Sequence, residues 1–430
     1  MGKNGGHLKF VRLVGGSGCT MSRMARPADK ATALWVVKKL RHCGHQALFA
    51  GGCVRDMLLS RRCADYDVAT DATPQQVKQM FRRVLMVGAK FGVAMVIKGD
   101  RMVEVATFRS DLSYSDGRRP DGVEFTSPKQ DALRRDFTIN GMFFDPIDER
   151  VIDHVSGRAD LARKVVRTIG QPEQRFAEDY LRMMRAVRFA VRLGFRIDPA
   201  TARAIEQFGP NIASISGERV YDELQKMFSC GGAAAGAELL GRLHLAEHIL
   251  PELFADAQAK LWDAATARLG AIDSKPDPVL SFGALLMDLP SPVIANIIRR
   301  WGQSNDLRKT LQWFTVHRDG WADAAELRLC EFKKILANAN YQKLKTLWSI
   351  RELQATGQRK QARRIARRAS GIDPRKIAPK PFVTGDRLLK MGYQPGRKIG
   401  LVLRKLYDDQ LDETLKTKQA ALNRARELLP

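Results

Sequence analysis

An early segment of this 430-residue chain combines the side chains that triphosphate chemistry requires. Two neighbouring glycines, Gly51 and Gly52, are followed by Arg55, and an apolar, strand-like run then carries Asp65 and Asp67. Because side chains alternate faces along a strand, the two aspartates are expected to point the same way, about 7 Å apart at their Cα atoms. Two carboxylates this close stay ionised only when a cation lies between them.

Magnesium fits this pair of carboxylates best, because it takes hard oxygen ligands and is usually held by one or two carboxylates plus substrate phosphates. The glycines let the backbone approach a phosphate, and the amides that open the next helix favour an anion. Each signal alone is common on solvated loops, but their order and compact spacing favour a metal and nucleotide site. We therefore predict that Asp65 and Asp67 are catalytic metal ligands and that Gly52 and Arg55 bind nucleotide.

A second group of candidate functional residues lies on a helix predicted over residues 178–192. Arg182, Arg185 and Arg188 recur every three residues and Asp179 precedes Arg182 by three, so all four are expected near one helix face. An aspartate accepts from an exocyclic amine and an arginine donates to a ring nitrogen or carbonyl, so the pair could bind the Watson–Crick edge of cytosine or adenine. The plainer alternative is an intrahelical salt bridge on a solvated face.

The elements that would position these residues follow from the hydrophobic periodicity and the turn residues. We expect a helix at 31–42, a strand at 46–50, a short helix to residue 60, a strand carrying Asp65, a helix from Thr73 and Pro74 to about residue 83, and a hairpin of strands 93–97 and 101–108. Beyond residue 157 the pattern predicts helices to the end of the chain and no strand. Helices and strands interleave only in the first part.

Charge favours a polyanionic partner. Lys and Arg number 72 against 47 Asp and Glu, a net charge of +25, and nucleic acid is the first candidate for such a chain. A membrane is disfavoured, because no stretch reaches the ~18 apolar residues that a span needs. A run at 359–368 concentrates six cations that repel one another unless an RNA backbone neutralises them: Arg359, Lys360, Arg363, Arg364, Arg367 and Arg368.

The six cysteines form no CxxC pair and no cysteine–histidine ligand pattern. Zinc and a disulfide framework are therefore not supported, and a reducing, cytoplasmic setting is the default. Residues 1–28 lack the apolar core of a secretory signal and are predicted to be a disordered leader.

Four motifs, in order, resemble those of the class II tRNA nucleotidyltransferase and bacterial poly(A) polymerase family. They are GGCVRD at 51–56 with DYDVAT at 65–70, RRDFTIN at 134–140, EDYLRMMRAVRF at 178–189 and ERVYDEL at 218–224. The segment at 384–400 is similar to the tail of certain bacterial CCA-adding enzymes, although its pattern alone fits a packed helix–helix turn equally well. Four ordered motifs make the resemblance highly specific.

The resemblance implies roles for further residues. Glu104, which by pattern alone could face water from an edge strand, would be a third catalytic carboxylate that holds a metal or accepts the proton of the attacking hydroxyl. Arg135, Asp136 and Asn140 would hold ribose and phosphates. The pair Asp179 and Arg182 would read the base, with Arg185 and Arg188 near the triphosphate.

Two local features are also interpreted through the family. The polar segment at 109–122 matches a loop that the family associates with adding the terminal adenosine, although alone it would be an ordinary surface loop. Gly141 stands where the family usually has alanine, a departure expected to loosen the strand that follows.

The implied fold is α+β, a mixed-sheet nucleotidyltransferase head at 29–155 followed by an all-helical neck at 156–235, body at 236–375 and RNA-binding tail at 376–430. The implied activity is the addition of CCA to the 3′ end of tRNA from CTP and ATP, with Mg²⁺ as cofactor and no obligate protein partner. A poly(A) polymerase and an A-only or CC-only enzyme remain as alternatives, because the shared motifs do not separate these enzymes from a CCA-adding one. An inactive RNA-binding protein is the alternative from another class. Retention of the carboxylates argues against the last, since binding a polyanion needs none of them.

Overall fold

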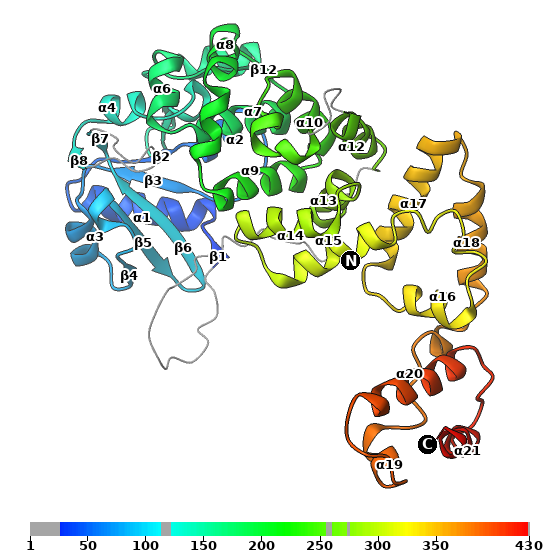
Figure 1. Ribbon diagram of the computed structural model, residues 1–430. Helices are drawn as coiled ribbons and strands as arrows, with labels where there is room; N and C mark the ends of the chain where they lie inside the picture. The colour runs from blue at the N-terminus through cyan, green and yellow to red at the C-terminus, as the bar shows by residue number, and fades with distance from the viewer. Residues whose placement is uncertain (1–25, 113–121, 255–259, 273–275, 429–430) are drawn as a thin grey trace. The chain divides into compact units, whose positions relative to one another are not determined.

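A computed structural model describes residues 26–112, 122–254, 260–272 and 276–428 (Figure 1). The chain divides into two compact units, the first ending at Met227 and regaining Leu239–Ile249, the second formed by Phe228–Glu238 and the chain from Leu250 onward. Most of the expected leader (1–25) and of the polar segment at 109–122 (113–121) lie outside the described residues. The boundaries expected at 155, 235 and 376 stay predictions.

The first unit is built on a mixed β-sheet. Eight strands of the described chain form it, in the order β10-β9-β2-β3-β6-β5-β4 with β1 beside β6. Their bounds are β1 Arg26–Pro27, β2 Ala47–Ala50, β3 Asp67–Thr70, β4 Val84–Leu85, β5 Val93–Lys98, β6 Arg101–Thr107, β9 Phe143–Asp145 and β10 Arg150–Ile152. Strands β7 Arg109–Asp111 and β8 Val123–Phe125 form a separate antiparallel pair. The mixed sheet of the head is thereby confirmed.

Helices complete the first unit. They are α1 Lys30–His42, α2 Gly52–Leu58, α3 Pro74–Met80, α4 Pro128–Leu133, α5 Gly157–Arg163, α6 Pro172–Glu178, α7 Leu181–Leu193, α8 Pro199–Phe208 and α11 Ala246–Ile249. Helices α9 Gly217–Ser229 and α10 Ala233–Arg242 each have residues in both units. Helix α1 packs along strands β2, β3 and β6 (Figure 1), because its Ala33, Val36, Val37 and Leu40 form a fully buried stripe.

Most of the expected elements near the site are confirmed. Thr73 caps α3 in a reciprocal capping box with Gln76, and Pro74 is the first helical residue. Strands β5 and β6 form the expected hairpin. One expectation for the later chain was wrong, because Val165–Val166 (β11) pairs in parallel with Arg196–Ile197 (β12); two residues are too few to produce an alternating pattern.

The second unit is helical in its described residues. Its helices are α12 Lys260–Gly270, α13 Pro278–Leu286, α14 Ser291–Arg300, α15 Asn305–Val316, α16 Leu329–Leu336, α17 Tyr341–Thr356, α18 Lys360–Ser370, α19 Gly385–Leu389, α20 Arg397–Leu411 and α21 Lys418–Glu427. This confirms the helical character expected of the later chain.

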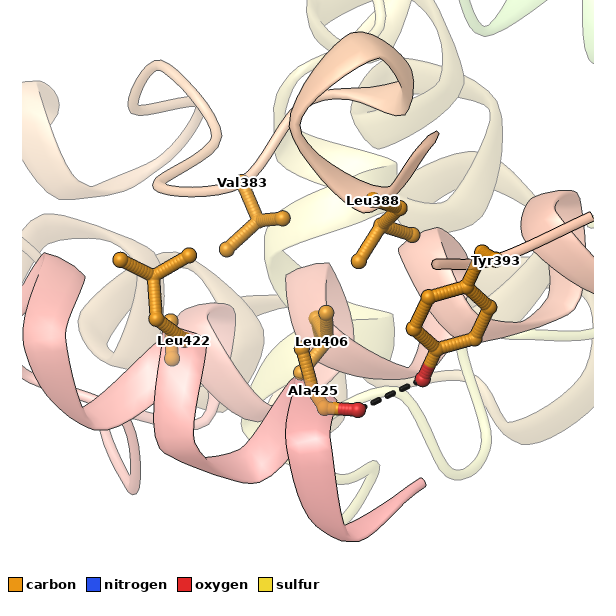
Figure 2. Packing of buried hydrophobic residues seen from close by; sticks show 7 residues of the cluster. Val383, Leu388, Tyr393, Leu406, Leu422 and Ala425 are labelled. Atoms are coloured by element: carbon orange, nitrogen blue, oxygen red, sulfur yellow. Dashed lines mark hydrogen bonds between the residues drawn. The ribbon is translucent and has the colours of Figure 1, made fainter. Parts of the chain in front are cut away.

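The C-terminal helices of this unit share a small core. Val383, Leu388, Tyr393 and Leu406 converge on Leu422 and its neighbours on α21, as Figure 2 shows. The Tyr393 hydroxyl donates a hydrogen bond of 2.6 Å to the Ala425 carbonyl oxygen, which satisfies the polar end of a buried ring (Figure 2). Part of the tail-like segment at 384–400 is therefore used for packing.

Gly141 does not loosen the strand that follows it. A Cβ atom at this position would lie 2.7 Å from Val155 Cγ2 and 2.9 Å from Ile169 Cδ1. These two side chains therefore occupy the space of the missing methyl group, and β9 begins two residues later with Phe143 fully buried. In this chain the glycine is compatible with close packing.

Replacing Gly141 by alanine is expected to destabilise the first unit by about 1–3 kcal/mol, because a methyl group is forced into an already filled space. Urea unfolding of the full chain measures the loss. Adding Val155→Ala to the variant should recover part of it. Gly209→Ala is the matched control, since its Cβ would meet neighbouring atoms only at 3.7 Å; equal losses in the two single variants would contradict the packing argument.

Candidate active site

A polar pocket opens in the first unit where β2 ends and β3 begins, beside Glu104 and Ala106 of β6. Its volume is about 570 Å³. Its described lining residues are Ala50, Gly51, Gly52, Arg55, Asp67, Val68, Val93, Glu104, Ala106, Arg109, Arg134, Arg135, Asp136, Asn140, Asp179, Leu181, Arg182, Arg185, Arg188, Phe189, Arg192 and Arg219. The pocket therefore brings together residues from all four sequence motifs.

Asp67 and Glu104 lie side by side at the sheet end of the pocket. Strands β3 and β6 are parallel, with Val68 beside Val105, and the two acids each precede this pair by one residue. Neighbouring strands are about 4.8 Å apart, so in-register side chains on one face are close neighbours. Both acids are half-buried and both line the pocket. Together they form a two-carboxylate set of the kind that binds a hard divalent cation.

Asp65 is placed differently from the expectation. Strand β3 begins at Asp67, so Asp65 lies before the strand and the alternation argument does not apply to it. Its Oδ1 accepts a hydrogen bond of 3.2 Å from the Ala28 amide, and Asp65 is absent from the described lining of the pocket. The acid found beside Asp67 in that lining is Glu104.

The turn before α2 requires glycine. Gly51 has φ +72° and ψ −130°, a conformation that side chains with a Cβ rarely adopt. A Cβ atom there would also approach Arg135 Nη1 to 3.2 Å. Gly51 and Gly52 both line the pocket, so the backbone at the start of α2 is accessible to a bound group.

A chain of hydrogen bonds connects the second motif to α2 and α7. The buried Arg55 donates from Nη1 to Asn140 Oδ1 at 2.6 Å and from Nε to Asp56 Oδ1 at 2.8 Å. Asn140 Nδ2 donates to Asp136 Oδ1 at 3.2 Å. Asp136 Oδ2 then accepts from Arg185 Nε and Nη2, at 2.9 and 2.5 Å. These residues hold one another in place without a ligand.

Asp136 is ionised in this network. Burial raises the pKa of its carboxyl group, but the charge and hydrogen bonds of Arg185, with the amide of Asn140, outweigh burial and hold the pKa at about 2. In the other direction, burial lowers the pKa of the Arg185 guanidinium, and the charge of Asp136 more than offsets that effect, so its pKa is raised. The pair therefore stays charged at neutral pH.

Two more arginines of the pocket are held by buried acids. Arg188 Nε donates to Glu223 Oε2 at 2.5 Å, and Glu223 is 1 % exposed. Arg135 donates from Nε and Nη2 to Asp131 Oδ2, at 3.1 and 2.8 Å. Burial raises the pKa of Asp131, but Arg135 and Arg134 outweigh it and lower the pKa.

Asp179 and Arg182 both line the pocket, but they do not lie on one helix as expected. Helix α7 begins at Leu181, and Asp179 is in extended conformation between α6 and α7, with φ −159° and ψ 103°. Its Oδ1 accepts from the Leu181 amide at 3.1 Å and its Oδ2 from Arg219 Nη2 at 2.6 Å. Arg182 pairs instead with Glu178. The intrahelical Asp179–Arg182 salt bridge, the plainer alternative, is thus not formed.

Several lining residues were missed by the sequence analysis. They are Arg109, Arg134, Arg192 and Arg219. Arg134 and Arg219 lie inside the quoted motifs, and Arg192 follows Arg188 by four residues on α7, so helical spacing could have indicated it. Arg109 lies on β7, and no local pattern indicates that its side chain reaches the pocket.

A cationic cavity of about 750 Å³ lies in the second unit, beside the turn between α17 and α18. Its described lining includes Arg359, Lys360, Arg363, Arg364 and Arg367. Arg364 pairs with Glu326 at 2.5 Å; the other four are exposed and have no acidic partner among the described residues. The cavity is therefore strongly positive.

The sixth cation of the predicted cluster is used differently. Arg368 donates to the carbonyl oxygens of Ala324, Ala325 and Leu327, at 3.1, 2.9 and 2.6 Å. Its guanidinium carbon also lies 4.5 Å from the centroid of the Phe332 ring. These contacts tie α18 to α16 and to the segment before it.

Helix α18 begins against a buried acid of α17. Glu352 is 2 % exposed, and its two carboxylate oxygens accept from the backbone amides of Gln361 and Ala362, at 2.6 and 2.7 Å. This satisfies two of the amides that a helix N-terminus otherwise leaves without an intrahelical partner.

The described residues set limits on other chemistry. No group of three His, Cys, Asp or Glu side chains among them is arranged to hold a metal, so a cation in the pocket would need oxygen atoms of a substrate beside Asp67 and Glu104. Burial, with the charge of Asp67, raises the pKa of the Cys53 thiol to about 12, so it is not a thiolate at neutral pH. No described helix is long and apolar enough to cross a membrane.

Comparison with known proteins places the chain in a family. A family model described as "Poly A polymerase head domain" matches residues 47–167, and one described as "Probable RNA and SrmB- binding site of polymerase A" matches residues 194–256. The chain is 32% identical to a CCA-adding enzyme of Lactobacillus gasseri, over 92% of this chain and 96% of the relative, and 34% identical to one of Pediococcus pentosaceus, over 92% and 97%.

A solved structure gives the same result. The crystal structure of the Bacillus stearothermophilus CCA-adding enzyme in complex with CTP is 29% identical to this chain, with a TM-score of 0.74, and covers 92% of this chain and 97% of its own. The resemblance drawn from the four motifs is thereby confirmed.

The stability of the first unit is expected to fall at acid pH through Asp136. Because its folded pKa, about 2, is below the ordinary value of 3.8, the contribution is complete above about pH 4 and is lost as the pH falls toward 2. This group alone accounts for about 2 kcal/mol of that fall. Urea unfolding between pH 5 and 2 should therefore show a shallower pH slope for Asp136→Asn than for the unmodified chain. Asp148→Asn, at an exposed aspartate, should keep the original slope; a D136N slope equal to that of the unmodified chain would contradict the analysis.

Proposed function

Because this chain belongs to the family of CCA-adding enzymes, we propose that its pocket adds C, C and then A to the 3′ end of tRNA, from CTP and ATP with release of pyrophosphate. The chain is a nucleotidyltransferase. The observation that carries the proposal is that Asp67 and Glu104 line one pocket together with nine arginines. Binding RNA without catalysis would not need two acids in the path of a polyanion.

The acids are the proposed centre of the reaction. Asp67 and Glu104 would hold Mg²⁺ together with the phosphates of the nucleotide, and Asp65 is the further metal ligand implied by the motif. Bound Mg²⁺ would polarise the attacking 3′ hydroxyl and neutralise the triphosphate. In the alternative role implied by the family, Glu104 would accept the hydroxyl proton instead of holding the metal.

The polar residues that line the pocket with these acids have two proposed roles. Arg55, Arg135, Arg185 and Arg188, with Gly52, Asp136 and Asn140, bind the ribose and phosphates, which requires fixed positive charge in a preorganised site. Asp179 and Arg182 bind the base. Both line the pocket but are held differently: Asp179 lies just before α7 and accepts from Arg219, and Arg182 lies in the first turn of α7. Asp179 accepts from the exocyclic amine that cytosine and adenine share, and Arg182 donates to the ring.

The second unit is the proposed RNA-binding part. Arg359, Lys360, Arg363, Arg364 and Arg367 line one cationic cavity, and phosphates of the tRNA backbone supply the missing counter-charge. Arg368, the sixth member of the predicted set, supports the cluster through its packing. The proposed setting is the cytoplasm, where tRNA, CTP and ATP are available.

Purified full-length protein should extend tRNA transcripts in a fixed order. A transcript ending before CCA should accept C from CTP, one ending in C should accept a second C, and one ending in CC should accept A from ATP and then stop. Radiolabelled triphosphates, supplied one at a time, and gels of single-nucleotide resolution measure this. A long run of A on an unstructured RNA would indicate a poly(A) polymerase instead.

Asp67→Ala should abolish extension in this assay while tRNA binding changes little, because the acid acts on the metal and not on the RNA. Asp148→Ala, an exposed aspartate of the same unit, is the control and should retain activity. Parallel loss of binding and extension in D67A would argue against a metal role.

Arg363→Gln should lower tRNA affinity and flatten its salt dependence. Removing one phosphate contact reduces the slope of log K against log [salt] by roughly 0.7–0.9. Filter binding at several salt concentrations measures the slope. Lys309→Gln removes one exposed charge from α15, outside the cavity lining; if it has the same effect as R363Q, the cavity has no special role.

A further inference from the structure

Arg175 on helix α6 is a junction of hydrogen bonds beside the nucleotide pocket. Its Nε donates to the Ile169 carbonyl at 3.1 Å, and its Nη2 donates to the Leu133 carbonyl at 2.9 Å. Its Nη1 reaches the Arg134 carbonyl at 3.4 Å. The guanidinium therefore fixes α6 to the end of α4 and to the segment before α6.

The Arg175 guanidinium also hydrogen-bonds Glu178, which in turn hydrogen-bonds Arg182. Arg175 Nη1 donates to Glu178 Oε1 and Oε2, at 3.2 and 3.0 Å, and Glu178 Oε2 accepts from Arg182 Nη1. Arg182 Nη1 also donates to the backbone carbonyl of Arg175 at 2.9 Å. The position of the Arg182 guanidinium is thus determined by two groups that Arg175 supplies or orients.

Arg175 and Glu178 lie outside the described lining of the nucleotide pocket. They line a neighbouring cavity of about 460 Å³ instead, together with Arg134, which lines both. Arg182 is 9 % exposed and faces the nucleotide pocket. An effect of Arg175 on the nucleotide would therefore be indirect, and the route with side-chain contacts at each step runs through Glu178 to Arg182.

We propose that Arg175 is a positioning residue that sets the choice of nucleotide, by holding Glu178 and through it the guanidinium of Arg182 in the orientation that reads the base. The inference rests on the proposed function, in which Arg182 contacts the base. A site that hydrogen-bonds its substrate rejects the wrong base only while its donors stay in place. Displacing one of them by about 1 Å is sufficient to lose much of that discrimination.

Lysine cannot replace arginine in this role. The contacts of Arg175 use all three guanidinium nitrogens, directed to carbonyls on two segments and to a carboxylate on its own helix. An ammonium group keeps the charge but is a single point that cannot reproduce the planar fork. Arg175→Lys therefore removes the geometry while leaving the electrostatics of the neighbourhood nearly unchanged.

The test measures kcat and KM for CTP and for UTP with the full-length protein and a tRNA transcript ending before CCA. The unmodified chain is compared with Arg175→Lys, Arg182→Ala and the double variant. In R175K the ratio of kcat/KM for CTP over UTP should fall on the order of tenfold. The double variant should be no less selective than R182A alone, because Arg175 acts through Arg182.

Arg318→Lys is the matched control. Arg318 also bridges a backbone carbonyl, that of Asp288, and a carboxylate, that of Asp319, but in the second unit, so this variant should keep the full selectivity. Thermal unfolding and tRNA binding of each variant show whether the fold is retained.

The possible outcomes distinguish a failure of the inference about Arg175 from a failure of the proposed function. If R182A loses selectivity and R175K keeps it, or if R175K slows CTP and UTP addition equally, the inference about Arg175 is wrong while the proposed function stands. If R182A itself keeps full selectivity, base reading by Arg182 is wrong and the inference falls with it. A further loss in the double variant beyond R182A would show that Arg175 acts by another route.

Discussion

The concentration of positive charge in one pocket is the constraint on which the first unit depends. Nine arginines line the described pocket, and without a ligand they repel one another. Buried carboxylates offset this repulsion, as Asp136 does for Arg185 and Glu223 for Arg188. Removing one partner of such a pair leaves an uncompensated charge, which costs far more than the pair itself contributes. The acids therefore hold the site together before any triphosphate arrives.

The same pairs make the pocket rigid. Asn140 and Asp136 connect Arg55 on α2 to Arg185 on α7, so two helices from different parts of the sequence share one hydrogen-bond network. Preorganised groups of this kind stabilise developing charge without reorganising during the reaction. Asp67 on β3 and Glu104 on β6 line the same pocket and take no part in the hydrogen bonds of this network.

Sequence periodicity predicted the parts of the site that are local. The three-residue spacing of Arg182, Arg185 and Arg188 placed them correctly on one helix, and the alternating hairpin placed Glu104 on β6. The failures lie at element ends. Asp65 and Asp179 were assigned to regular elements, but each lies just before one. The carboxylate of Asp65 accepts a hydrogen bond from the distant Ala28 amide, and that of Asp179 accepts one from the first amide of α7.

Contacts between segments that are distant in the sequence could not be predicted from local sequence patterns. The six cations at 359–368 look equivalent in the sequence, yet Arg368 is held by the carbonyls of Ala324, Ala325 and Leu327, about forty positions earlier. Gly141 looked like a loosening substitution because the side chains that fill its space, Val155 and Ile169, come later in the chain. No window of neighbouring residues contains this information.

The parallel register of β3 and β6 separates what can vary in this fold from what cannot. Asp67 and Glu104 meet because Val68 lies beside Val105, and the chain between the two strands passes through α3, β4 and β5 before it returns. A longer or shorter crossover changes loop entropy only slightly. A slip of one residue in either strand turns its acid to the opposite face of the sheet. The connection between the two strands can therefore change in length, whereas their register has to be kept for the two acids to remain neighbours.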